Sequence, residues 1–397
     1  MAKAAVVLVL ALPAIAGLMK ADKSSAENRR LATLPALPHS WQEFLRVPGQ
    51  LDAWANDHFG MRDGLVRSMT RLRYRLFGEF PTSQVARGRH GRNFLASHSP
   101  ALPPFSAVTA ACGIGTRASP GTVEYINRMF ADFHRMGLQP RLLIVPSVPP
   151  VYSADMPAWL EQRCASPQTP VTQVLDDPQL VAEARQNIYY PLGEMRAIAA
   201  RGTSLFPKNW FHWSGPGLGE VAQLSVQHFW QGAAGAAQPP LRTREDWLQS
   251  DIAHLFPGLH LGSVVTRPDY EASGVQACRG DACFPDLQGV GDKLGDVSLY
   301  RNPAAPARRL VLVTDSFGSM VAGWYARHYR TVEHFATNNM GQLSAEEIGR
   351  LKRHLFADAG QTDLLFLYHD GGAIYNVLKA GAEPLHRDAA STVVAAH

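Results

Sequence analysis

The chain has 397 residues, of which 46% are hydrophobic and 18% charged, and its formal net charge is +4. This length suits two to three domain-sized units, or one α/β domain with insertions. The apolar fraction is ordinary for a folded protein and excludes a disordered chain. The one long apolar run lies at the N-terminus, which excludes a multi-span membrane protein. Because the basic residues form no block, we expect no nucleic-acid partner.

The N-terminus predicts export. Lys3 precedes an apolar run from Ala4 to Met19, and Lys20 follows it. The segment Ala14-Ile15-Ala16 has the small residues of a signal-peptide cleavage site. The run contains a proline and is shorter than the roughly 20 residues of a spanning helix. We therefore assign residues 1–22 to a signal peptide or signal-anchor, and the sequence leaves open which of the two it is.

Export predicts that the four cysteines form disulfides, because an even number of cysteines in an oxidising compartment is normally paired. Cys278 and Cys283 enclose a short loop that a bridge can close. Cys112 and Cys164 are then the remaining pair. A zinc site would need clustered C-x-x-C spacing, which the sequence lacks, so we expect no metal.

The first part of the chain predicts helices and a hairpin. Apolar residues recur at helical intervals from Leu51 to Leu76, with charged residues between them. Residues 85–95 place turn residues between two short apolar pieces, which is typical of a hairpin. We assign residues 23–100 to an N-terminal helical segment and hairpin-like turn that belong to the main domain.

The rest of the chain alternates helices with apolar strands. Continuous apolar runs are typical of strands buried on both faces. In chain order we expect a helix at 122–136, a strand at 141–146, a loop at 147–160, a helix at 178–200 broken at Pro191, a short strand at 205–206, a helix at 215–230, an irregular insert at 231–300, a strand at 309–314, a helix at 320–328, a strand at 332–335, a helix at 344–356 and a strand at 363–368.

This alternation predicts the fold class. Strands that alternate with helices form parallel, doubly wound sheets with helices on both faces. We therefore expect one α/β domain over residues 101–380, with the insert at about 231–300. Residues 381–397 are expected to form a C-terminal tail.

The sharpest candidate for chemistry is Ser316. The apolar run 309–314 is followed by Asp315-Ser316-Phe317-Gly318, so the serine stands at the turn from a strand into a helix. In an open parallel sheet, ligands bind outside the carboxyl ends of the strands. A serine there offers a hydroxyl nucleophile and a backbone N–H that can stabilise an oxyanion. An ordinary Asp-Ser helix cap would have the same local sequence.

A serine nucleophile needs a base, and histidine is the usual one. His212 lies in the segment Asn209–Gly215, between a predicted strand and a predicted helix. Two tryptophans and a phenylalanine surround it, which indicates a half-buried, positioned imidazole. A core histidine would have the same surroundings.

Five short segments, in order along the chain, resemble motifs of the alginate O-acetyltransferase family of SGNH-hydrolase-like periplasmic polysaccharide O-acetylation proteins. The resemblance covers roughly residues 30–375. The segments are Asp57–Arg62 (family pattern N-D-H-F-x-x-R), Gly88–Leu95 (G-k-d-G-W-L-F), Val145 through Tyr152 to Pro157 (v-P-x-K-x-x-x-Y-x-x-x-x-P), Phe211–Trp213 (D-x-H-W) and Thr314–Phe317 (G-D-S-F).

The resemblance implies an SGNH-hydrolase-like fold and a role for each matching residue. Ser316 would accept the acyl group and His212 would be its general base. Asp315 would bond the nucleophile turn rather than the imidazole, and the backbone N–H of Ser316 would supply part of the oxyanion hole. The supporting residues implied are the oxyanion candidates Asn338 and Asn339 and the pocket-lining candidate Tyr368.

The resemblance also implies a function. The protein would transfer acetyl through a serine acyl-enzyme to hydroxyls of an exported polysaccharide, without a cofactor. A membrane-bound O-acyltransferase would be the partner that delivers the acetyl group. The protein would be periplasmic, either soluble after signal cleavage or tethered to the inner membrane by its N-terminal segment.

One departure from the family pattern bears on catalysis. The family places the acid that orients the histidine two residues before it, where this chain has Trp210. Loss of that carboxylate costs about 10⁴ in rate in a serine triad. Three explanations are open. Another carboxylate or a backbone carbonyl takes the place of the missing acid, the site is a weak Ser–His dyad, or the protein is a non-catalytic glycan-binding or assembly component.

Two further points stay open in the sequence. A carbohydrate acetylesterase of the same fold would use the same acyl-enzyme, with water as the acceptor. His369-Asp370 offers a second histidine beside an acid. Because adjacent residues rarely face each other, we assign that pair no role.

Overall fold

The computed structural model describes residues 32–58, 62–230, 238–374 and 376–387. The expected signal segment at 1–22 lies outside these residues, as do the end of the expected C-terminal tail and residues 59–61 of the first family-like motif. Within the described ranges, no helix is both long and apolar enough to span a membrane.

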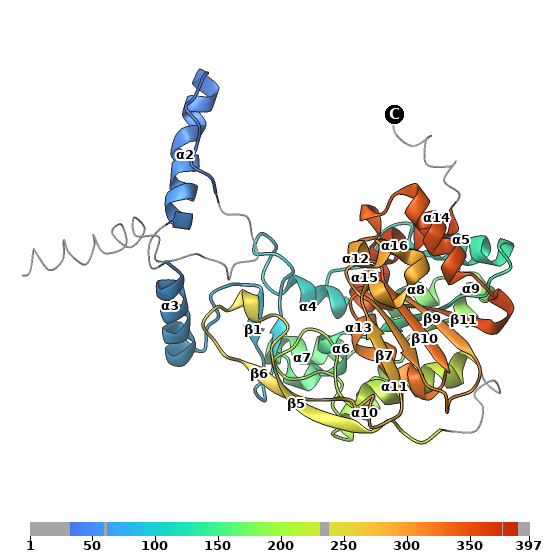
Figure 1. Ribbon diagram of the computed structural model, residues 1–397. Helices are drawn as coiled ribbons and strands as arrows, with labels where there is room; N and C mark the ends of the chain where they lie inside the picture. The colour runs from blue at the N-terminus through green and yellow to red at the C-terminus, as the bar shows by residue number, and fades with distance from the viewer. Residues whose placement is uncertain (1–31, 59–61, 231–237, 375, 388–397) are drawn as a thin grey trace, which may run out of the picture.

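A seven-stranded sheet forms the centre of the protein (Figure 1). Its order is β4-β3-β11-β9-β10-β8-β7. The five strands from β4 to β10 are parallel, whereas β8 pairs antiparallel with both β10 and β7. The strands are β3 (Arg141–Val145), β4 (Ile188–Tyr189), β7 (Gln276–Arg279), β8 (Val297–Arg301), β9 (Arg309–Thr314), β10 (Thr331–Ala336) and β11 (Thr362–His369).

The sheet is covered on both faces, which confirms the predicted α/β class. Along β9, Leu310 and Leu312 pack into the core on one face, and Val311 and Val313 pack into the core on the other. A central strand must therefore be apolar at every position, which explains the continuous run in the sequence.

Helices and single turns form the two outer layers. Those contributing to the first core include α4 (Ser106–Ala111), α6 (Val148–Val151), α7 (Ala158–Cys164), α10 (Leu192–Ala200), α11 (Gly217–Phe229) and α13 (Gly318–Val321). Those contributing to the second include α5 (Thr122–Arg135), α8 (Pro170–Asp176), α9 (Ala182–Gln186), α12 (Val290–Leu294), α14 (Ala345–Leu355), α15 (Asp370–Ile374) and α16 (Val377–His386).

The N-terminal segment forms two helices and the predicted hairpin. Helix α2 (Trp41–His58) has no buried residue and projects from the body in Figure 1. Helix α3 (Arg62–Phe77) docks on the insert, where the Arg71 guanidinium donates to the Gly258 carbonyl at 2.8 Å. Strands β1 (Val85–Arg87) and β2 (Asn93–Leu95) pair antiparallel, which confirms the hairpin.

The predicted insert is more regular than expected. Strands β5 (Thr243–Gln249) and β6 (Gly262–Pro268) form a separate antiparallel ribbon. Strands β7 and β8 extend the central sheet. The sheet is therefore mixed rather than wholly parallel. These strands were missed because β5 and β7 are largely exposed and lack the apolar runs of the central strands.

Several predicted elements differ in detail. Residues 205–206 are not a strand, although both side chains are buried. Residues 147–160 contain short helices rather than a loop, and residues 178–200 contain β4 between α9 and α10. Helix α13 passes into a 3₁₀ helix (Ala322–Arg327). The domain runs beyond 380, because Leu385 of α16 is fully buried.

Both predicted disulfides are present. Cys112 and Cys164 join α4 to α7 with their Cα atoms 4.8 Å apart, and both side chains are buried. Cys278 and Cys283 close the short loop after β7, with Cα atoms 5.7 Å apart. No free cysteine remains.

The two bridges should differ in their contribution to stability. They span sequence separations of 52 and 5 residues, and the entropy removed from the unfolded chain grows with loop length. We expect the double variant Cys112→Ser/Cys164→Ser to lose about 4 kcal/mol of unfolding free energy, and Cys278→Ser/Cys283→Ser about 2 kcal/mol. Urea unfolding of both variants measures the difference, and equal losses would contradict the loop-length argument.

Candidate active site

Ser316 lies at the carboxyl end of the central strand β9, in the turn that leads into α13. The side chain of the next residue, Phe317, is fully buried and anchors the turn in the core. The backbone N–H of Ser316 has no hydrogen-bond acceptor among the described residues. This turn therefore leaves both the Ser316 hydroxyl and a backbone N–H donor available at the carboxyl end of the central strands.

His212 lies in the loop between α10 and α11, which the resembling motifs hold in place. The Arg92 guanidinium donates to the Phe206 carbonyl at 3.1 Å and lies 3.9 Å from the centre of the Tyr152 ring. The Tyr152 hydroxyl in turn accepts from the backbone N–H of Leu205 at 3.2 Å. The N–H of Leu205 and the carbonyl of Phe206 are thus bonded to side chains rather than to a neighbouring strand.

His212 and Ser316 are in direct contact. The distance from His212 Nε2 to Ser316 Oγ is 2.9 Å. The next residue, Trp213, fixes the loop by donating its indole N–H to the Phe317 carbonyl at 2.7 Å. The structure thus brings the two main sequence candidates together across a gap of 104 residues.

The carboxylate that the family-like motif lacks comes from the insert. Asp251 Oδ2 lies 2.7 Å from His212 Nδ1. The same carboxylate accepts the backbone N–H groups of Phe211 at 2.9 Å and His212 at 2.8 Å. Because Nδ1 donates to the carboxylate, Nε2 is left as an acceptor for the Ser316 hydroxyl. Ser316, His212 and Asp251 therefore have the hydrogen-bond order of a serine triad.

The ribbon β5–β6 positions Asp251. Asp251 follows the end of β5, and the Ser250 hydroxyl donates to the Asn209 carbonyl. The Asn209 amide then donates to the Gly262 carbonyl, at the start of β6, at 2.8 Å. These bonds tie the base of the ribbon to the histidine loop. Sequence reasoning missed Asp251, because no spacing rule links it to His212 and other acids also occupy the insert.

Asp315 has a different set of partners. It accepts the backbone N–H of Phe317 at 2.9 Å and so bonds the turn after β9. Its other oxygen accepts the backbone N–H of His369 at 2.9 Å and lies 2.6 Å from His369 Nδ1. His369 is therefore paired with Asp315, whereas Asp370 accepts the backbone N–H and the hydroxyl of Ser147, each at 3.0 Å. Burial lowers the pKa of His369, but the Asp315 carboxylate outweighs it and the net direction is upward.

The three weaker candidates lie apart from this arrangement. Tyr368 is fully buried in the core, with its hydroxyl 2.7 Å from the Thr337 hydroxyl. The Asn339 amide donates to the Leu294 carbonyl at 3.2 Å, and Asn338 is exposed. No hydrogen bond in the described ranges joins either asparagine to Ser316 or His212. In the same ranges, no group of three or more His, Cys, Asp or Glu side chains is placed to hold a metal ion.

Comparison with known sequences gives no relative, because no family model and no curated protein match this chain. Solved structures do resemble it. A DHHW family protein from Eubacterium siraeum is 13% identical with a TM-score of 0.45, over 68% of this chain and 89% of that one. PatB1 from Bacillus cereus is 12% identical with a TM-score of 0.42, over 66% and 92% of the two chains.

The O-acetyltransferase domain of AlgJ from Pseudomonas putida is also similar, at 15% identity and a TM-score of 0.40, over 77% of this chain and 95% of that one. Identities this low describe a likeness of fold.

Proposed function

We propose that the protein is a periplasmic O-acetyltransferase that passes an acetyl group through Ser316 to hydroxyls of an exported polysaccharide. The observation that carries this proposal is the hydrogen-bond chain from Ser316 through His212 to Asp251. In this order the three groups are competent for nucleophilic acyl transfer. The polysaccharide and the acetyl group are inferred from the resemblance of five sequence segments to the O-acetylation family.

The first half-reaction forms an acyl-enzyme. The Ser316 hydroxyl oxygen attacks the carbonyl carbon of the acetyl donor, and His212 Nε2 takes the hydroxyl proton. The free N–H of Ser316 donates to the oxygen of the tetrahedral intermediate. His212 then returns the proton to the departing group as the bond to the carbonyl carbon breaks. Asp251 keeps the imidazole in the required tautomer and stabilises its positive charge.

The second half-reaction reverses these roles. A sugar hydroxyl attacks the acyl-enzyme while His212 accepts its proton, and the proton passes to Ser316 as the serine leaves. A membrane-bound O-acyltransferase would supply the acetyl group on the exported side of the membrane. The pair of disulfides supports an oxidising compartment.

A non-catalytic role and a carbohydrate acetylesterase are the alternatives to this function. A non-catalytic role was based on Trp210 at the expected acid position, and Asp251 removes that reason because it supplies the carboxylate from elsewhere. A carbohydrate acetylesterase would use the same acyl-enzyme with water as the acceptor. The acceptor experiment below separates the esterase from the transferase.

We expect Ser316 to react covalently with a sulfonyl fluoride, because a serine activated by histidine is far more nucleophilic than a surface serine. Mass spectrometry after incubation should give one adduct, located at Ser316. The adduct should be lost in Ser316→Ala and His212→Ala. Ser319→Ala is the matched control, since Ser319 lies in the same region but bonds Asp296. Labelling that survives in Ser316→Ala would contradict the assignment.

We expect Asp251→Asn to lower kcat by about 10⁴, because an amide fixes the wrong imidazole tautomer. The assay is release of the alcohol from a chromogenic acetyl ester. Asp246→Asn serves as the control, since Asp246 lies on the same ribbon but pairs with Arg267 and should leave kcat near that of the parent protein. Equal rates in Asp251→Asn and Asp246→Asn would contradict this prediction, because they would show that Ser316 and His212 act as a dyad without Asp251.

With an oligosaccharide acceptor present, we expect Ser316-dependent formation of acetylated sugar. The acyl-enzyme partitions between water and the sugar hydroxyl, so the sugar should also raise alcohol release if deacylation is slow. Mass spectrometry of the sugar measures the product. Turnover that depends on Ser316 but yields no acetylated sugar with any acceptor would favour the esterase.

A further inference from the structure

A cavity of about 680 Å³ opens between α4 and the carboxyl ends of β3 and β11. This volume falls within the range of about 300–1,000 Å³ typical of small-molecule sites. Apolar side chains dominate its lining, among them Phe94, Leu102, Val148, Phe211, Ile374 and Val377. None of the roles described above uses this cavity.

The cavity begins one aromatic ring away from the nucleophile. Phe211 lines it, and its ring centre lies 4.9 Å from that of His212 and 5.6 Å from that of Phe317. His369 also lines it, and its ring stacks on Phe317 at 4.8 Å. Since the Phe211 ring lines the cavity and contacts the His212 ring, the inner wall of the cavity lies next to the triad, although neither Ser316 nor His212 lines it.

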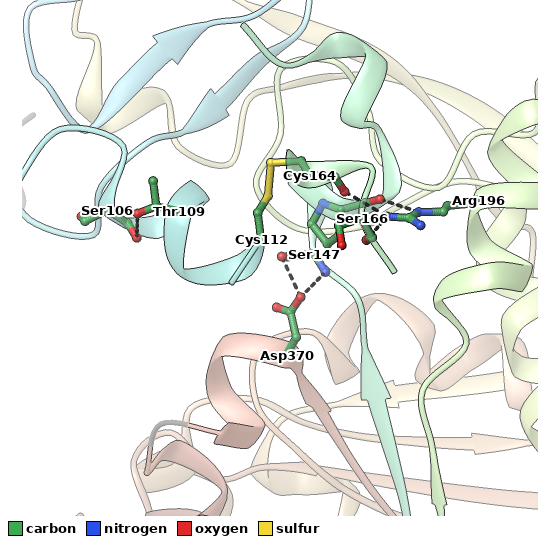
Figure 2. The surroundings of a disulfide bond; sticks show 9 residues. Ser106, Thr109, Cys112, Ser147, Cys164, Ser166, Arg196 and Asp370 are labelled. Carbon is green, nitrogen blue, oxygen red and sulfur yellow. Dashed lines mark hydrogen bonds between the residues drawn. A yellow bond between two sulfur atoms is a disulfide. The ribbon is translucent and has the colours of Figure 1, made fainter. Parts of the chain in front are cut away.

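Several hydroxyl and carboxyl groups of the lining are engaged with the protein, whereas the indole N–H of Trp210, which also lines the cavity, has no partner among the described residues. Asp370 binds Ser147 through two hydrogen bonds, and Thr109 donates to the Ser106 carbonyl at 3.2 Å (Figure 2). The Ser106 hydroxyl is 3.0 Å from that of Ser97. A sugar ring would bring several hydroxyls that need partners, and leaving them unpaired costs free energy. The cavity therefore suits an apolar ligand better than a sugar.

Two of the three ionisable groups in the lining agree with this conclusion, whereas the Asp315 carboxylate raises the pKa of the third, His369, and favours its charged form. Burial lowers the pKa of His98, and nearby His369 lowers it further. Burial raises the pKa of Asp370. Both directions favour the neutral form, as expected beside an apolar ligand.

The outer wall of the cavity is fixed in place. Helix α4 contributes Ser106, Ala107, Thr109, Ala110 and Ala111 to the lining, and its C-terminal end is tied by the Cys112–Cys164 disulfide to α7 (Figure 2). The bridge holds the C-terminal end of α4, and with it the outer wall of the cavity, beside α7.

We propose that this cavity binds an apolar chain carried by the ester on which Ser316 acts. The chain is either an acyl group longer than acetyl or the alcohol to which the acyl group is attached. The covalent chemistry is that of the triad above, so this inference rests on the proposed acyl transfer at Ser316. It adds a preference for substrates that carry a hydrocarbon chain beside the reacting carbonyl.

Two substrate series test the proposal and distinguish the two sources of the chain. The first lengthens the acyl group of p-nitrophenyl esters from two to ten carbons, and the second lengthens the alkyl alcohol of acetate esters. Each methylene buried in the cavity should raise kcat/KM by about fourfold until the cavity is filled. A rise in the first series assigns the chain to the acyl group, and a rise in the second assigns it to the alcohol. Flat profiles in both series would overturn the proposal.

A variant that fills the cavity locates the effect. Ala110→Phe places a ring in the cavity. The kcat/KM for the hexanoyl ester divided by that for the acetyl ester should then fall at least about tenfold. If the alcohol carries the chain, the same fall is expected in the ratio between long-chain and short-chain alkyl acetates. Ala197→Phe makes the same change on the exposed face of α10 and should keep the ratio of the parent protein. An unchanged ratio in Ala110→Phe would overturn the assignment to this cavity.

A binding measurement separates this inference from the proposed function. In Ser316→Ala, calorimetry should detect 1-octanol binding that is far tighter than ethanol binding and that weakens in Ser316→Ala/Ala110→Phe. If no ester shows Ser316-dependent turnover, acyl transfer fails while octanol binding still upholds the cavity as an apolar site. If turnover depends on Ser316 but octanol does not bind, the cavity proposal alone fails.

Discussion

The carboxylate of Asp251 is the interaction on which the site depends. It accepts three donors: the N–H groups of Phe211 and His212 and the ring Nδ1–H of His212. The two backbone bonds fix the carboxylate against the same residue whose ring it orients, so the ring and its acid are held as one unit. With Nδ1 committed, Nε2 has one role left, which is to accept the proton of Ser316.

A second carboxylate fixes the nucleophile in the same way. Asp315 also accepts three donors, from Phe317, the backbone of His369 and the ring of His369. These bonds tie the turn after β9 to the end of the neighbouring strand β11. The base is thus anchored to the insert and the nucleophile to the sheet. Precise contact between Ser316 and His212 follows from two rigid supports rather than from one flexible loop.

The sequence predicted what is encoded locally. The apolar run of β9 and the turn residues after it identify Ser316 as the end of a buried strand, and the aromatic neighbours of His212 mark a positioned ring. Asp251 had no such signal, because its role depends on a ribbon whose strands are largely exposed and alternate weakly. Likewise, β7 and β8 joined the sheet through long-range pairing that no local pattern indicates. Tyr368, proposed as a pocket-lining residue, lies in the core, because the end of a strand can be buried as deeply as its middle.

The position of Asp251 suggests why the acid can come from different places in the chain. Ser316 must stand at the end of a central strand, and His212 must reach its hydroxyl, so both are fixed by the core. The acid needs only to accept the Nδ1–H from the opposite side of the ring, at a point that the sheet does not reach. Any segment that can be anchored beside the histidine loop meets that requirement.

Here the anchor is Asn209, which bonds both Ser250 and Gly262 at the base of the ribbon. Trp210, standing where the family pattern has its acid, is free to pack in the interior and line the apolar cavity instead.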